Sequence, residues 1–599
     1  MKQLLSGNEA IALGAYHAGL GVAAAYPGTP STEILEAIAC LRGVYAEWSP
    51  NEKVALDVAI GASWSGARAM ASMKHVGLNV AADPFFSVAY SGVGGGLVVI
   101  TADDPGMHSS QNEQDNRHYA RSAKVPLLEP ADSQECYDFT RLAFELSERF
   151  NTPVLVRTTT RVAHSRTVVD VTGERPPLPE AKFRHDPGRF VLVPANARRL
   201  HPGVEARQQA LAEYACSFPG NRAEAGDGRL GIVTSGVAYH YAREVFPDAS
   251  LLKLGLSYPT PETLLRSFAA SVQRLVVVEE LDPILEGEVK ALGLAAEGKS
   301  IFPILGEFDL GVVEASARRA GLLAGDSAEA LPAVPDVPLP PRPPVLCPGC
   351  PHRSTFYVLS LLGRRQKRAD GSSQEPQLVI AGDIGCYTLG VLPPLGALDS
   401  CVSMGSSIGM ALGAAKAGVK DKIVAVIGDS TFMHSGIAAL VDVVYNQGNL
   451  TVVVLDNGTT AMTGHQENPA TGVSALGQQT QAIDIANLAR AVGVSDVREA
   501  NAFDLPGLRR ALKGAFDNPG ASVVVVKGLC ALRNKEPKRQ AVVDAEKCNA
   551  CGLCLRIGCP AVVKGENGVT IDQNLCVGSV CQTLCGQVCA HDAIHLAEL

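Results

Sequence analysis

The sequence predicts a multidomain α/β protein that ends in a cysteine-rich tail, and three observations support this fold class. The chain has 599 residues, too many for one hydrophobic core, so we expect about three to five domains. Short β-rich runs alternate with helical stretches in three successive blocks, as in layered α/β folds. Eight of the sixteen cysteines lie within the last 52 residues, which sets that segment apart from the rest.

The composition excludes several classes of protein. Hydrophobic residues make up 46% of the chain, charged residues 19% and aromatic residues 5%, as in an ordinary globular protein. A net charge of −9 and the absence of a long basic run argue against a nucleic-acid partner. The first residues lack the pattern of a signal peptide, and no apolar run reaches the roughly 18 residues of a membrane span. We therefore expect a cytoplasmic protein without a membrane partner.

The first two blocks, residues 1–180 and 181–330, both have the pattern of alternating strands and helices. In the first, the runs LVVIT (97–101) and VPLLEP (125–130) predict strands. In the second, RLGIVTSG, SLLKLGLSYPTP and RLVVVEELDP each predict a strand that ends in a turn. The acidic residues Glu279, Glu280 and Asp282 follow the last of these strands, and we expect them to be solvated rather than catalytic.

A proline-rich segment separates these blocks from the second half of the chain. Residues 331–344, LPAVPDVPLPPRPP, contain seven prolines and predict an extended linker. Residues 345–535 form a third α/β block, with strands predicted in QLVIAGD, KIVAVIGD, LTVVVLDN and ASVVVVKG. Within it, RRQKRADGSSQEP (364–376) predicts a surface loop. The charged segment 533–540 then leads to a tail domain, residues 540–599.

The third block contains polar residues at the ends of two strands. Asp429 follows the strand KIVAVIG, and Asn457 follows the strand LTVVVLD after an intervening apolar helix. Because neighbouring parallel strands open on one crevice at their carboxyl ends, these two side chains can meet there. A carboxylate, an amide oxygen and a nearby backbone carbonyl suit Mg²⁺, which completes its shell with phosphate oxygens. Glycines 428, 436 and 458 would let a diphosphate approach the backbone closely.

The tail has the cysteine pattern of a bacterial ferredoxin. Cys548, Cys551, Cys554 and Cys559 form a first run that ends in Cys-Pro, although four residues rather than three precede the last cysteine. The second run is Cys576, Cys581, Cys585 and Cys589, whose spacing departs further and which lacks the usual proline. In two-cluster ferredoxins the fourth cysteine of each run crosses to the other cluster. We predict two [4Fe-4S] clusters, with a three-iron cluster or zinc as alternatives.

A further cysteine pair lies just after the proline-rich segment, in CPGCPHR (347–353). On its own, a Cys-x-x-Cys pair is compatible with half of a zinc site, with a redox dithiol, or with part of a site whose other ligands are distant in the sequence. A thioredoxin-type dithiol usually opens a helix after the first strand of its fold, whereas this pair follows a linker. A zinc knuckle needs a second nearby pair, and the next cysteine is Cys386.

Several segments together resemble a known family. Besides GDS (428–430) and DN (456–457), the segments AMTGHQENPATG (461–472), VIAGDIGCYTLG (379–390) and VSMGSSIGMALGAAKA (402–417) occur in the order found in the 2-oxoacid:ferredoxin oxidoreductase family. Within that family the chain is most similar to the large subunits of the indolepyruvate type, over essentially its whole length. GDS and DN depart from the GDG and NN of the usual thiamine diphosphate signature.

The resemblance implies a role for each block. Residues 1–180 would be the pyrimidine-binding domain of a thiamine diphosphate enzyme, 181–330 a transketolase-C-terminal-like domain, 345–535 the diphosphate and magnesium domain, and 540–599 a ferredoxin-like 2[4Fe-4S] domain. Glu52, in EWSPNEKVALDVAIGAS, matches the carboxylate that activates the cofactor. Without the resemblance, Glu52 is equally a glutamate that stabilises a helix start. Thr29, in AYPGTPSTEI, matches a threonine that contacts the 2-oxoacid.

The resemblance also implies cofactor, metal and substrate residues in the second half. His352 and His465 are candidate proton-handling residues near the cofactor and substrate, although a lone histidine is more often structural. The magnesium ligands would be Asp429, Asn457 and the carbonyl of Thr459. The implied cofactor-binding residues as a whole are Asp383, Gly385, Met404, Gly428, Asp429, Ser430, Asn457 and Thr459.

For the CPGC pair, the resemblance implies a third [4Fe-4S] cluster beside the thiamine. Its ligands would be Cys347, Cys350, Cys386 and Cys530. The alternative is that these four are structural thiols without metal, and that only the tail binds iron.

The resemblance finally implies an activity and partners. The activity is the oxidative decarboxylation of aryl 2-oxoacids with coenzyme A, with electrons passed to ferredoxin. A smaller β subunit is expected as partner, in a heterodimer that assembles as α2β2, because the cofactor normally lies between associated domains. The alternatives are another 2-oxoacid specificity, a non-oxidative thiamine-dependent decarboxylase, or an electron-transfer subunit with a vestigial thiamine site.

Overall fold

The computed structural model describes residues 1–597 except 179, 184, 324–342, 364–377 and 566–567. The predicted loop 364–376 and most of the predicted linker 331–344 therefore lie outside the described residues. The chain divides into two compact units, Met1–Val337 and Pro338–Leu599. Each unit contains two of the segments expected from the sequence. No helix among the described residues is long and apolar enough to cross a membrane.

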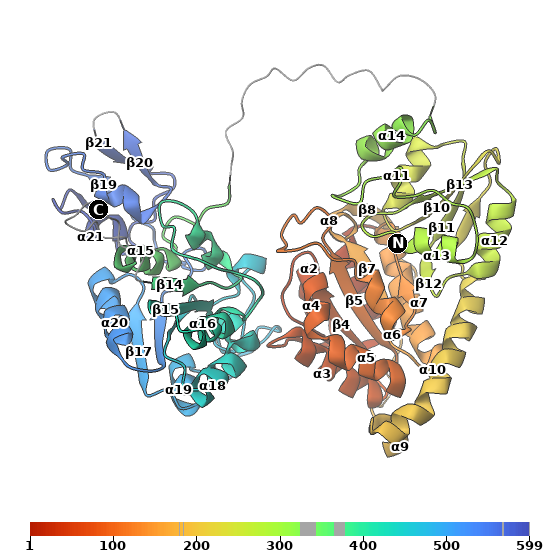
Figure 1. Ribbon diagram of the computed structural model, residues 1–599, viewed down its shortest axis with the longest axis horizontal. Coiled ribbons are helices and arrows are strands. Elements are labelled where there is room, and N and C mark those ends of the chain that lie inside the picture. The colour runs from red at the N-terminus through yellow and green to blue at the C-terminus, as the bar shows by residue number, and fades with distance from the viewer. Residues whose placement is uncertain (179, 184, 324–342, 364–377, 566–567, 598–599) are drawn as a thin grey trace. The chain divides into compact units, whose positions relative to one another are not determined.

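Unit 1 is built on a mixed sheet of seven strands (Figure 1). All neighbouring strands run parallel except the edge pair β12 and β6. In sheet order the strands are β12 (Leu256–Tyr258), β6 (Leu127–Leu128), β7 (Val154–Thr159), β5 (Leu97–Asp103), β4 (Arg68–Lys74), β2 (Leu20–Ala25) and β3 (Tyr45–Trp48). Of these strands, β5 and β6 were predicted from the sequence, whereas β2, β3, β4 and β7 were missed.

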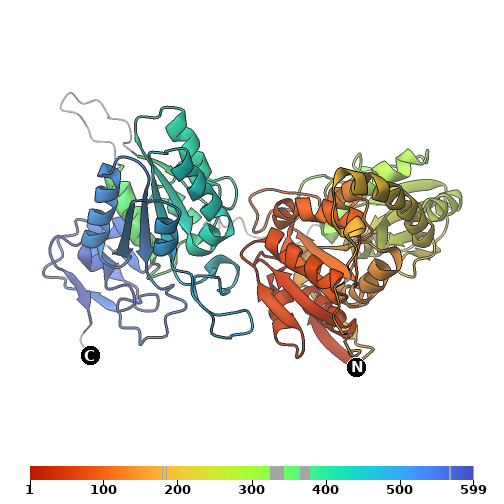
Figure 2. The same ribbon diagram turned by 90° about the horizontal axis from the view of Figure 1, so that it is seen from below.

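Helices cover both faces of this sheet, so its strands are buried on both sides (Figure 2). One face packs against α1 (Gly7–His17), α2 (Thr32–Ala39) and α7 (Ser133–Phe150), and the other against α3 (Glu52–Trp64), α4 (His75–Val80) and α5 (Ala82–Ser91). The remaining elements of this part are α6 (Arg117–Ala123), α8 (Thr160–His164) and the antiparallel pair β1 (Lys2–Ser6) and β8 (Arg166–Asp170). Burial on both faces explains the near-continuous apolar runs of the strands.

The second half of unit 1 is a smaller sheet of four strands. Their order is β13 (Arg274–Val278), β10 (Leu230–Ser235), β11 (Ser250–Leu254) and β9 (Arg222–Glu224), of which only β9 is antiparallel to its neighbour. Helices α11 (Ala238–Val245), α12 (Glu262–Ala270), α13 (Ile284–Ala291) and α14 (Leu310–Arg319) accompany it. Helices α9 (Pro187–Phe190) and α10 (Pro194–Ala215) precede it.

The predicted strand SLLKLGLSYPTP is in fact two strands that belong to different sheets. β11 pairs with β10 in the four-stranded sheet, whereas β12 pairs with β6 in the seven-stranded sheet. The chain passes between them at Gly255, where an added Cβ would overlap the Phe139 ring and the Gly220 carbonyl. The two halves of unit 1 are therefore joined by a shared segment as well as by side chains.

The expectation that the acidic run after β13 is solvated was wrong for two of its three residues. Glu279 is 2% exposed and Glu280 is 6% exposed. Glu279 accepts hydrogen bonds from Arg117 at 2.5 Å and from the backbone N–H groups of Leu285 and Glu286. The arginine lies 162 residues earlier in the chain, so no local pattern could reveal the pairing.

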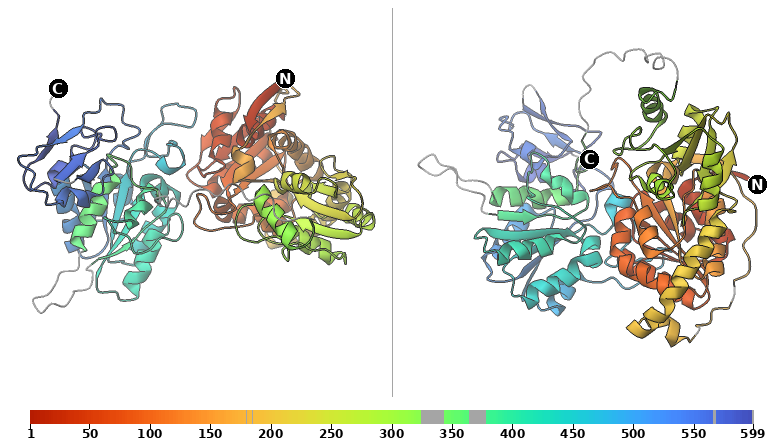
Figure 3. Two further views of the ribbon diagram at one scale, coloured as in Figure 1. Left: turned by 90° about the horizontal axis from the view of Figure 1, so that it is seen from above. Right: turned by 45° about the vertical axis from the view of Figure 1, so that its right-hand side comes forward.

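Unit 2 contains a parallel five-stranded sheet with helices on both faces (Figure 3). In sheet order the strands are β14 (Leu378–Ala381), β15 (Lys422–Gly428), β16 (Thr451–Asp456), β18 (Ser522–Lys527) and β17 (Asp496–Asn501). The helices are α15 (His352–Leu362), α16 (Ser407–Lys416), α17 (Asp429–Thr431), α18 (Ile437–Tyr445), α19 (Ile485–Ala491) and α20 (Leu505–Asp517). The four strands predicted here are confirmed, and β17 was missed.

The cysteine-rich tail is part of unit 2 rather than a separate body. It has the antiparallel pairs β19 (Ala541–Val543) with β22 (Ile594–Leu596) and β20 (Val562–Gly565) with β21 (Gly568–Ile571), and the short helix α21 (Leu584–Gln587). Tail residues such as Ile557 and Leu584 share one hydrophobic core with Phe356 and Leu508 of the preceding block. The tail is thus held against the side of the sheet that carries α15 and α20.

Candidate functional site

Asp429 and Asn457 lie at the carboxyl ends of neighbouring strands, as the sequence predicted. β15 ends at Gly428 and β16 ends at Asp456, and the two strands pair in parallel with Gly428 opposite Leu455. Both side chains are buried, with exposed fractions of 3% for Asp429 and 6% for Asn457. This edge of the sheet is the usual place for a ligand in an open parallel α/β fold.

Asp429 has one occupied and one open carboxylate oxygen. Its Oδ1 accepts the backbone N–H of Ser430 at 2.7 Å, while its Oδ2 is buried and has no hydrogen-bond partner among the described residues. Burial and the nearby Asp456 carboxylate raise the pKa of Asp429 to about 7. The nearby Asn468 amide opposes this rise in the pKa, and its nitrogen has no hydrogen-bond partner within the described ranges. A buried carboxylate oxygen left open in this way suits a bound cation.

Asn457 is held in one orientation by its neighbours. Its Nδ2 lies 3.2 Å from Nε2 of His352, and its Oδ1 accepts the backbone N–H of Thr459 at 3.2 Å. Burial lowers the pKa of His352 to about 4, so its ring is neutral at pH 7 and can accept the amide hydrogen. His352 thus contacts Asn457, and its proposed role as a proton-handling residue remains a prediction.

Two of the predicted cofactor glycines lie under one aromatic ring. A Cβ added at Gly385 or at Gly428 would overlap the ring of Tyr387. The Tyr387 hydroxyl donates to the carbonyl of Ile384 at 2.9 Å and lies 3.3 Å from the Thr431 hydroxyl. Tyr387, which was not predicted as a site residue, therefore links the loop that contains Ile384 to α17. A side chain at either glycine would force this ring away.

Asp383 organises the neighbouring loop. Its carboxylate accepts three backbone N–H groups, from Ile384 at 2.8 Å, Gly405 at 2.7 Å and Ser407 at 2.9 Å. Asp383 is fully buried, so these bonds replace the water it would otherwise bind. Met404 lies half-buried in the same loop. The three hydrogen bonds show that the Asp383 carboxylate fixes this loop. A contact of Asp383 or Met404 with the cofactor remains a prediction.

The helix that follows Asp429 begins with an irregular turn. Residues Phe432–Gly436 form a π-helical turn between α17 and α18. Such turns are rare and occur often at functional sites. His434 in this turn is buried, and its Nδ1 lies 2.5 Å from the Ser435 hydroxyl. The sequence did not predict this turn, because a π-helical turn has the same kinds of residue as the α-helix around it.

In unit 1, the predicted catalytic residue Glu52 is the first residue of α3. Asn51 caps this helix by accepting the N–H of Val54 at 2.9 Å. Glu52 is nevertheless only 5% exposed, and a Cβ added at Gly77 of α4 would overlap its carboxylate. Asn51 already caps this helix, and a glutamate that only stabilises a helix start is usually exposed. The burial of Glu52 against Gly77 is therefore more consistent with the predicted cofactor role, which remains a prediction.

Thr29 lies in a loop at the same edge of the seven-stranded sheet, after β2. It is half-buried and precedes Pro30. A Cβ at the adjacent Gly28 would overlap the stem of Lys74, the last residue of β4. Lys74 is itself buried and donates from Nζ to the Ser109 carbonyl at 2.7 Å. Thr29 and Lys74 therefore border one small region at the carboxyl edge of unit 1.

His465, the second predicted proton-handling residue, lies in the loop after β16. Its backbone carbonyl accepts a hydrogen bond from Arg533 at 3.0 Å, and its residue is half-buried. Its Nε2 is buried and unpaired within the described part of the chain. The same loop is fixed by an ion pair between Arg533 and Glu467 at 2.7 Å. The structure thus gives His465 an ordered place, and its substrate role remains a prediction.

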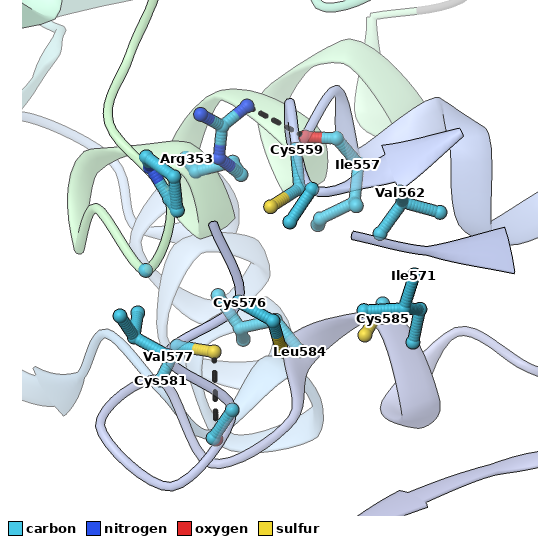
Figure 4. A pocket seen from close by; sticks show the side chains of 14 residues that line it. Arg353, Ile557, Cys559, Val562, Ile571, Cys576, Val577, Cys581, Leu584 and Cys585 are labelled. Atoms are coloured by element: carbon cyan, nitrogen blue, oxygen red, sulfur yellow. Dashed lines mark hydrogen bonds between the residues drawn. The ribbon is translucent and has the colours of Figure 1, made fainter. Parts of the chain in front are cut away.

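The eight tail cysteines line two pockets. One pocket is lined by Cys548, Cys551, Cys554 and Cys589, together with residues such as Asn549 and His591. The other is lined by Cys559, Cys576, Cys581 and Cys585, and Figure 4 shows these four labelled around it. In each pocket three cysteines come from one run and one from the other run. This is the crossed grouping that the ferredoxin pattern predicts.

The thiols in each tail pocket are close enough to affect one another. Burial raises the pKa of Cys585 to about 12, and the charges of Cys581, Cys559 and Cys576 add to this effect. Burial likewise raises the pKa of Cys554, with contributions from Cys589, Cys551 and Cys548. Thiols so crowded are poor thiolates by themselves, and a bound metal would deprotonate them.

The four cysteines proposed for a third cluster also come together. Burial raises the pKa of Cys350 to about 12 against the nearby Arg353 charge, and Cys386 and Cys347 raise it further. Burial raises the pKa of Cys386 to about 11, with added effects of Cys347 and Cys530. The sequence positions of these cysteines span more than 180 residues, yet the fold makes them neighbours. Their grouping was predicted only through the family resemblance.

No group of three or more His, Cys, Asp or Glu side chains in the described ranges is arranged to hold a single metal ion. The two tail sets instead line the walls of pockets. The predicted magnesium set contains only one carboxylate, with an amide and a backbone carbonyl completing it.

Comparison with known families agrees with the two units. The family described as "Thiamine pyrophosphate enzyme, C-terminal TPP binding domain" matches residues 383–526. The family described as "Pyruvate flavodoxin/ferredoxin oxidoreductase, thiamine diP-bdg" matches residues 13–207. The first match spans the strands around Asp429 and Asn457, and the second includes Thr29 and Glu52.

Comparison with individual proteins extends over the whole chain. Indolepyruvate oxidoreductase subunit IorA of Archaeoglobus fulgidus is 42% identical, covering 100% of this chain and 98% of the relative. Those of Methanothermobacter thermautotrophicus and Thermococcus kodakarensis are 45% and 42% identical and cover 98% and 99% of this chain and 96% of each relative. A solved 2-oxoglutarate:ferredoxin oxidoreductase from Magnetococcus marinus matches 53% of this chain and 65% of its own at 19% identity, with a TM-score of 0.45.

The sequence identities, the two thiamine diphosphate domains and the buried edge at Asp429 point the same way. They also confirm the family that the motifs suggested. The chain belongs to the indolepyruvate oxidoreductase IorA family of thiamine diphosphate-dependent oxidoreductases.

Proposed function

We propose that this chain oxidatively decarboxylates aryl 2-oxoacids of the indolepyruvate and phenylpyruvate type, with coenzyme A, to aryl-acetyl-CoA and carbon dioxide, and passes the electrons to ferredoxin. Decarboxylation of a 2-oxoacid with oxidation follows from the family. The aryl substrate is supported by relatives at 40–45% identity that are named for indolepyruvate. Coenzyme A as acyl acceptor and ferredoxin as electron acceptor are the finer parts of the proposal.

One observation carries the oxidative reaction over the non-oxidative alternative. Asn457, a predicted magnesium ligand, has hydrogen-bond contacts with one member of the third cysteine set and with a residue next to another member. Its carbonyl accepts the backbone N–H of Cys530 at 3.1 Å, and its side chain contacts His352, two residues after Cys350. A decarboxylase that only releases an aldehyde would not need an electron-accepting cluster, and so would not need cluster-binding cysteines at this position.

The residues at the sheet edge fit magnesium and a diphosphate. Asp429 Oδ2, Asn457 Oδ1 and the Thr459 carbonyl would hold Mg²⁺, and the buried, unpaired Asp429 Oδ2 is the observation that supports this. When bound, thiamine diphosphate supplies the carbanion chemistry that releases carbon dioxide from a 2-oxoacid. The dry surroundings of Asp429 would strengthen its attraction for the cation. The Tyr387 ring packs directly on Gly385 and Gly428, where neither residue has a side chain, and so keeps this loop in place beside the proposed diphosphate site.

Glu52 and Thr29 would act on the other part of the cofactor and on the substrate. The Glu52 carboxylate would hold the proton at the ring nitrogen of the aminopyrimidine, which is the role of the matching carboxylate in related enzymes. Its burial keeps water from competing for that hydrogen bond. Thr29 would donate its hydroxyl proton to a substrate oxygen. Both assignments depend on the family resemblance and on the burial described above.

The three cysteine sets would hold [4Fe-4S] clusters, which supply one-electron acceptors. The two tail sets fit because each lines a pocket with four cysteines. The third set fits because the charges of its thiols affect one another, with Cys350 and Cys530 buried and Cys347 exposed. We place the reaction in the cytoplasm, where thiols stay reduced and available to iron.

A second, smaller subunit completes the proposed enzyme. The relatives are named as subunits, which supports a partner chain, and an α2β2 assembly is the simplest form. A ferredoxin-type carrier would take the electrons. Neither nucleic acid nor a membrane has a place in the proposal.

The test is an anaerobic assay of the chain co-purified with its partner subunit. Indolepyruvate, coenzyme A and methyl viologen are supplied, and dye reduction and acyl-CoA formation are followed. Reduction that depends on coenzyme A is the expected result, together with about twelve irons per chain for three clusters. Phenylpyruvate, pyruvate and 2-oxoglutarate serve as matched substrates for the aryl preference.

Each alternative predicts a different outcome of the same assay. Aldehyde formation without dye reduction would identify a non-oxidative decarboxylase. Turnover of pyruvate or 2-oxoglutarate in preference to arylpyruvates would overturn the aryl assignment but leave the family unchanged. No turnover of any 2-oxoacid, with clusters that still accept electrons from dithionite, would identify an electron-transfer subunit.

A further inference from the structure

Arg353, the last residue of the CPGCPHR motif, is a buried arginine between two of the cysteine sets. It is 3% exposed and lies in the first turn of α15. Its Nη2 donates to the carbonyls of Leu346 at 2.6 Å and Cys347 at 3.0 Å. Its Nη1 donates to the carbonyls of Ile557, at 3.3 Å, and Gly558 in the tail. Figure 4 shows its side chain beside the tail pocket, with the bond to Ile557 dashed.

The guanidinium borders both sets of thiols. On one side its Nη2 donates to the backbone carbonyl of Cys347, a member of the CPGC pair, at 3.0 Å. On the other side Arg353 lines the pocket of Cys559, Cys576, Cys581 and Cys585. The two sets are also in contact through the CPGC loop, since a Cβ added at Gly349 would overlap Val577 and come within 3.6 Å of the Cβ of Cys581. A single cation thus faces two neighbouring sets of four cysteines.

Arg353 lacks a negatively charged partner among the described side chains. Its four hydrogen bonds within the described part of the chain go to neutral carbonyls, and its buried Nε has no partner there. A buried charge that is not paired is strongly unfavourable. Carbonyl dipoles offset part of this cost, but the remaining positive charge calls for an anion that no side chain supplies.

We propose that Arg353 is the shared counter-charge of two adjacent iron-sulfur clusters and sets their reduction potentials. The clusters are those of Cys347, Cys350, Cys386 and Cys530 and of Cys559, Cys576, Cys581 and Cys585. This inference rests on the proposed function, which assigns clusters to these sets. Arg353 is a positioning and tuning residue, because its contacts are to the loops that hold the cysteines.

The direction of the effect follows from charge. A cluster held by four thiolates is anionic, and it becomes more negative when it accepts an electron. A buried positive charge stabilises the reduced form more than the oxidised form, and the low dielectric of the interior strengthens this preference. Arg353 therefore raises both potentials, which favours the acceptance of electrons at these two positions over the third, where the pocket of Cys548 and Cys589 does not include Arg353.

The test is a redox titration of the cluster-loaded chain, followed by electron paramagnetic resonance, with Arg353→Gln. Two clusters should shift to more negative potentials, by about tenfold in the ratio of reduced to oxidised cluster, which is about 59 mV for a one-electron couple. The third cluster should keep its potential and serve as an internal reference. Arg556→Gln is the matched control, because Arg556 is exposed and only one residue from Ile557.

A structural role for Arg353 makes a different prediction. Arg353→Lys keeps the charge but loses the forked geometry, so under our proposal it keeps both potentials within about twofold of the original ratio. Unchanged potentials in Arg353→Gln, with full iron content, would overturn the proposal and leave the cluster assignment intact. If Arg353→Gln loses iron, Arg353→Lys decides, because equal loss in both variants would show that geometry rather than charge matters. Absence of iron from the unmodified chain would instead reject the cluster assignment itself.

Discussion

Among the described residues, deeply buried arginines lie at two sites, one in each unit, and these sites satisfy the buried charge in different ways. In unit 1, Arg117 bonds to Asp115 at 2.6 Å and to Glu279 at 2.5 Å. Its neighbour Arg157 bonds to Asp103 at 2.6 Å and Glu129 at 2.7 Å. In unit 2, Arg353 is bonded only to carbonyls among the described residues.

The difference lies in whether a buried arginine has carboxylate partners. The carboxylates of unit 1 come from the ends of both sheets, so the ion pairs of Arg117 join the seven-stranded and four-stranded parts. Unit 2 leaves a buried carboxylate oxygen at Asp429 open, crowds twelve thiols into three sets, and leaves a buried guanidinium without a carboxylate. Buried charges in proteins are usually paired or bind ions. The unpaired Asp429 oxygen and the Arg353 guanidinium therefore fit a unit that binds a cation at one place and anionic clusters at another.

The largest expected effect concerns Glu52, which is buried in unit 1 but lies outside the arginine network. Glu52→Gln keeps the size of the side chain and removes the carboxylate. We expect kcat for an arylpyruvate to fall by about 10⁴-fold, at the upper end of what a positioned acid or base contributes. Because the shape is kept, the melting temperature should change little. A loss of less than tenfold at full cofactor occupancy would contradict the assigned role.

The next largest effect tests the closed network of unit 1. Arg117→Met leaves Asp115 and Glu279 buried without their cation, and we expect unit 1 to lose about 3–5 kcal/mol of stability. Hydrogen exchange of unit 1 peptides in the full chain measures this. Arg121→Met is the matched control, because Arg121 lies in the same helix, α6, and is 45% exposed in its pair with Glu288. Equal effects of the two substitutions would show that the network contributes no special stability.

A smaller effect is expected at the open carboxylate of unit 2. Asp429→Asn removes the proposed magnesium ligand, so thiamine diphosphate with Mg²⁺ should no longer stabilise the protein. In the unmodified chain, ligand at 100 times its Kd adds about 2.7 kcal/mol. The protein without ligand should be no less stable than the original, since a buried carboxylate with a raised pKa has been replaced by a neutral amide. A stabilisation by Mg²⁺ and thiamine diphosphate that survives the substitution would reject Asp429 as a ligand.

The same contrast explains which parts could be predicted from the sequence. Asp429 and Asn457 were found because both follow strands that are neighbours in the sheet, so a local strand-helix-strand pattern places them together. The crossed tail sets were found because cysteine spacing is local. In contrast, the partner of Glu279 lies 162 residues away, and nothing in RLVVVEELDP distinguishes a buried carboxylate from a solvated one.

Residue type alone also left roles ambiguous. His352 was predicted to handle protons because histidine titrates near pH 7. In the fold, burial lowers its pKa to about 4 and its Nε2 lies 3.2 Å from the Asn457 amide, while its role at the substrate remains a prediction. Arg353 was part of a quoted motif without an assigned role, since an arginine in a loop is usually exposed. Only the fold reveals that its surroundings combine carbonyls and thiols. The strand break at Gly255 was missed for the same reason, because the close contact with Phe139 is tertiary.

The smallest expected effect is a pH dependence of unit 1 that comes from Glu280. Burial raises its pKa from 4.5 to about 7, and the nearby Glu307 carboxylate raises it as well. A carboxyl group with a raised pKa in the folded state stabilises the fold below its unfolded pKa, and this contribution is lost as the pH rises through about 7. We therefore expect unit 1 to lose about 1–3 kcal/mol between pH 5 and pH 8.

The substitution Glu280→Gln isolates this contribution. Other groups titrate in the same range, and Asp103, with its pKa raised to about 6 by burial, changes stability in the same direction. His75 acts in the opposite direction, since burial lowers its pKa to about 4 and protonation would destabilise the fold. The difference between the unmodified chain and Glu280→Gln cancels both. Glu262→Gln, at an exposed ion pair with Arg266, should leave the pH dependence unchanged. If Glu280→Gln has the same pH dependence as that control, the Glu280 carboxylate must be stabilised in its ionised form by the nearby charges of Arg157 and Arg117. That result would contradict the prediction.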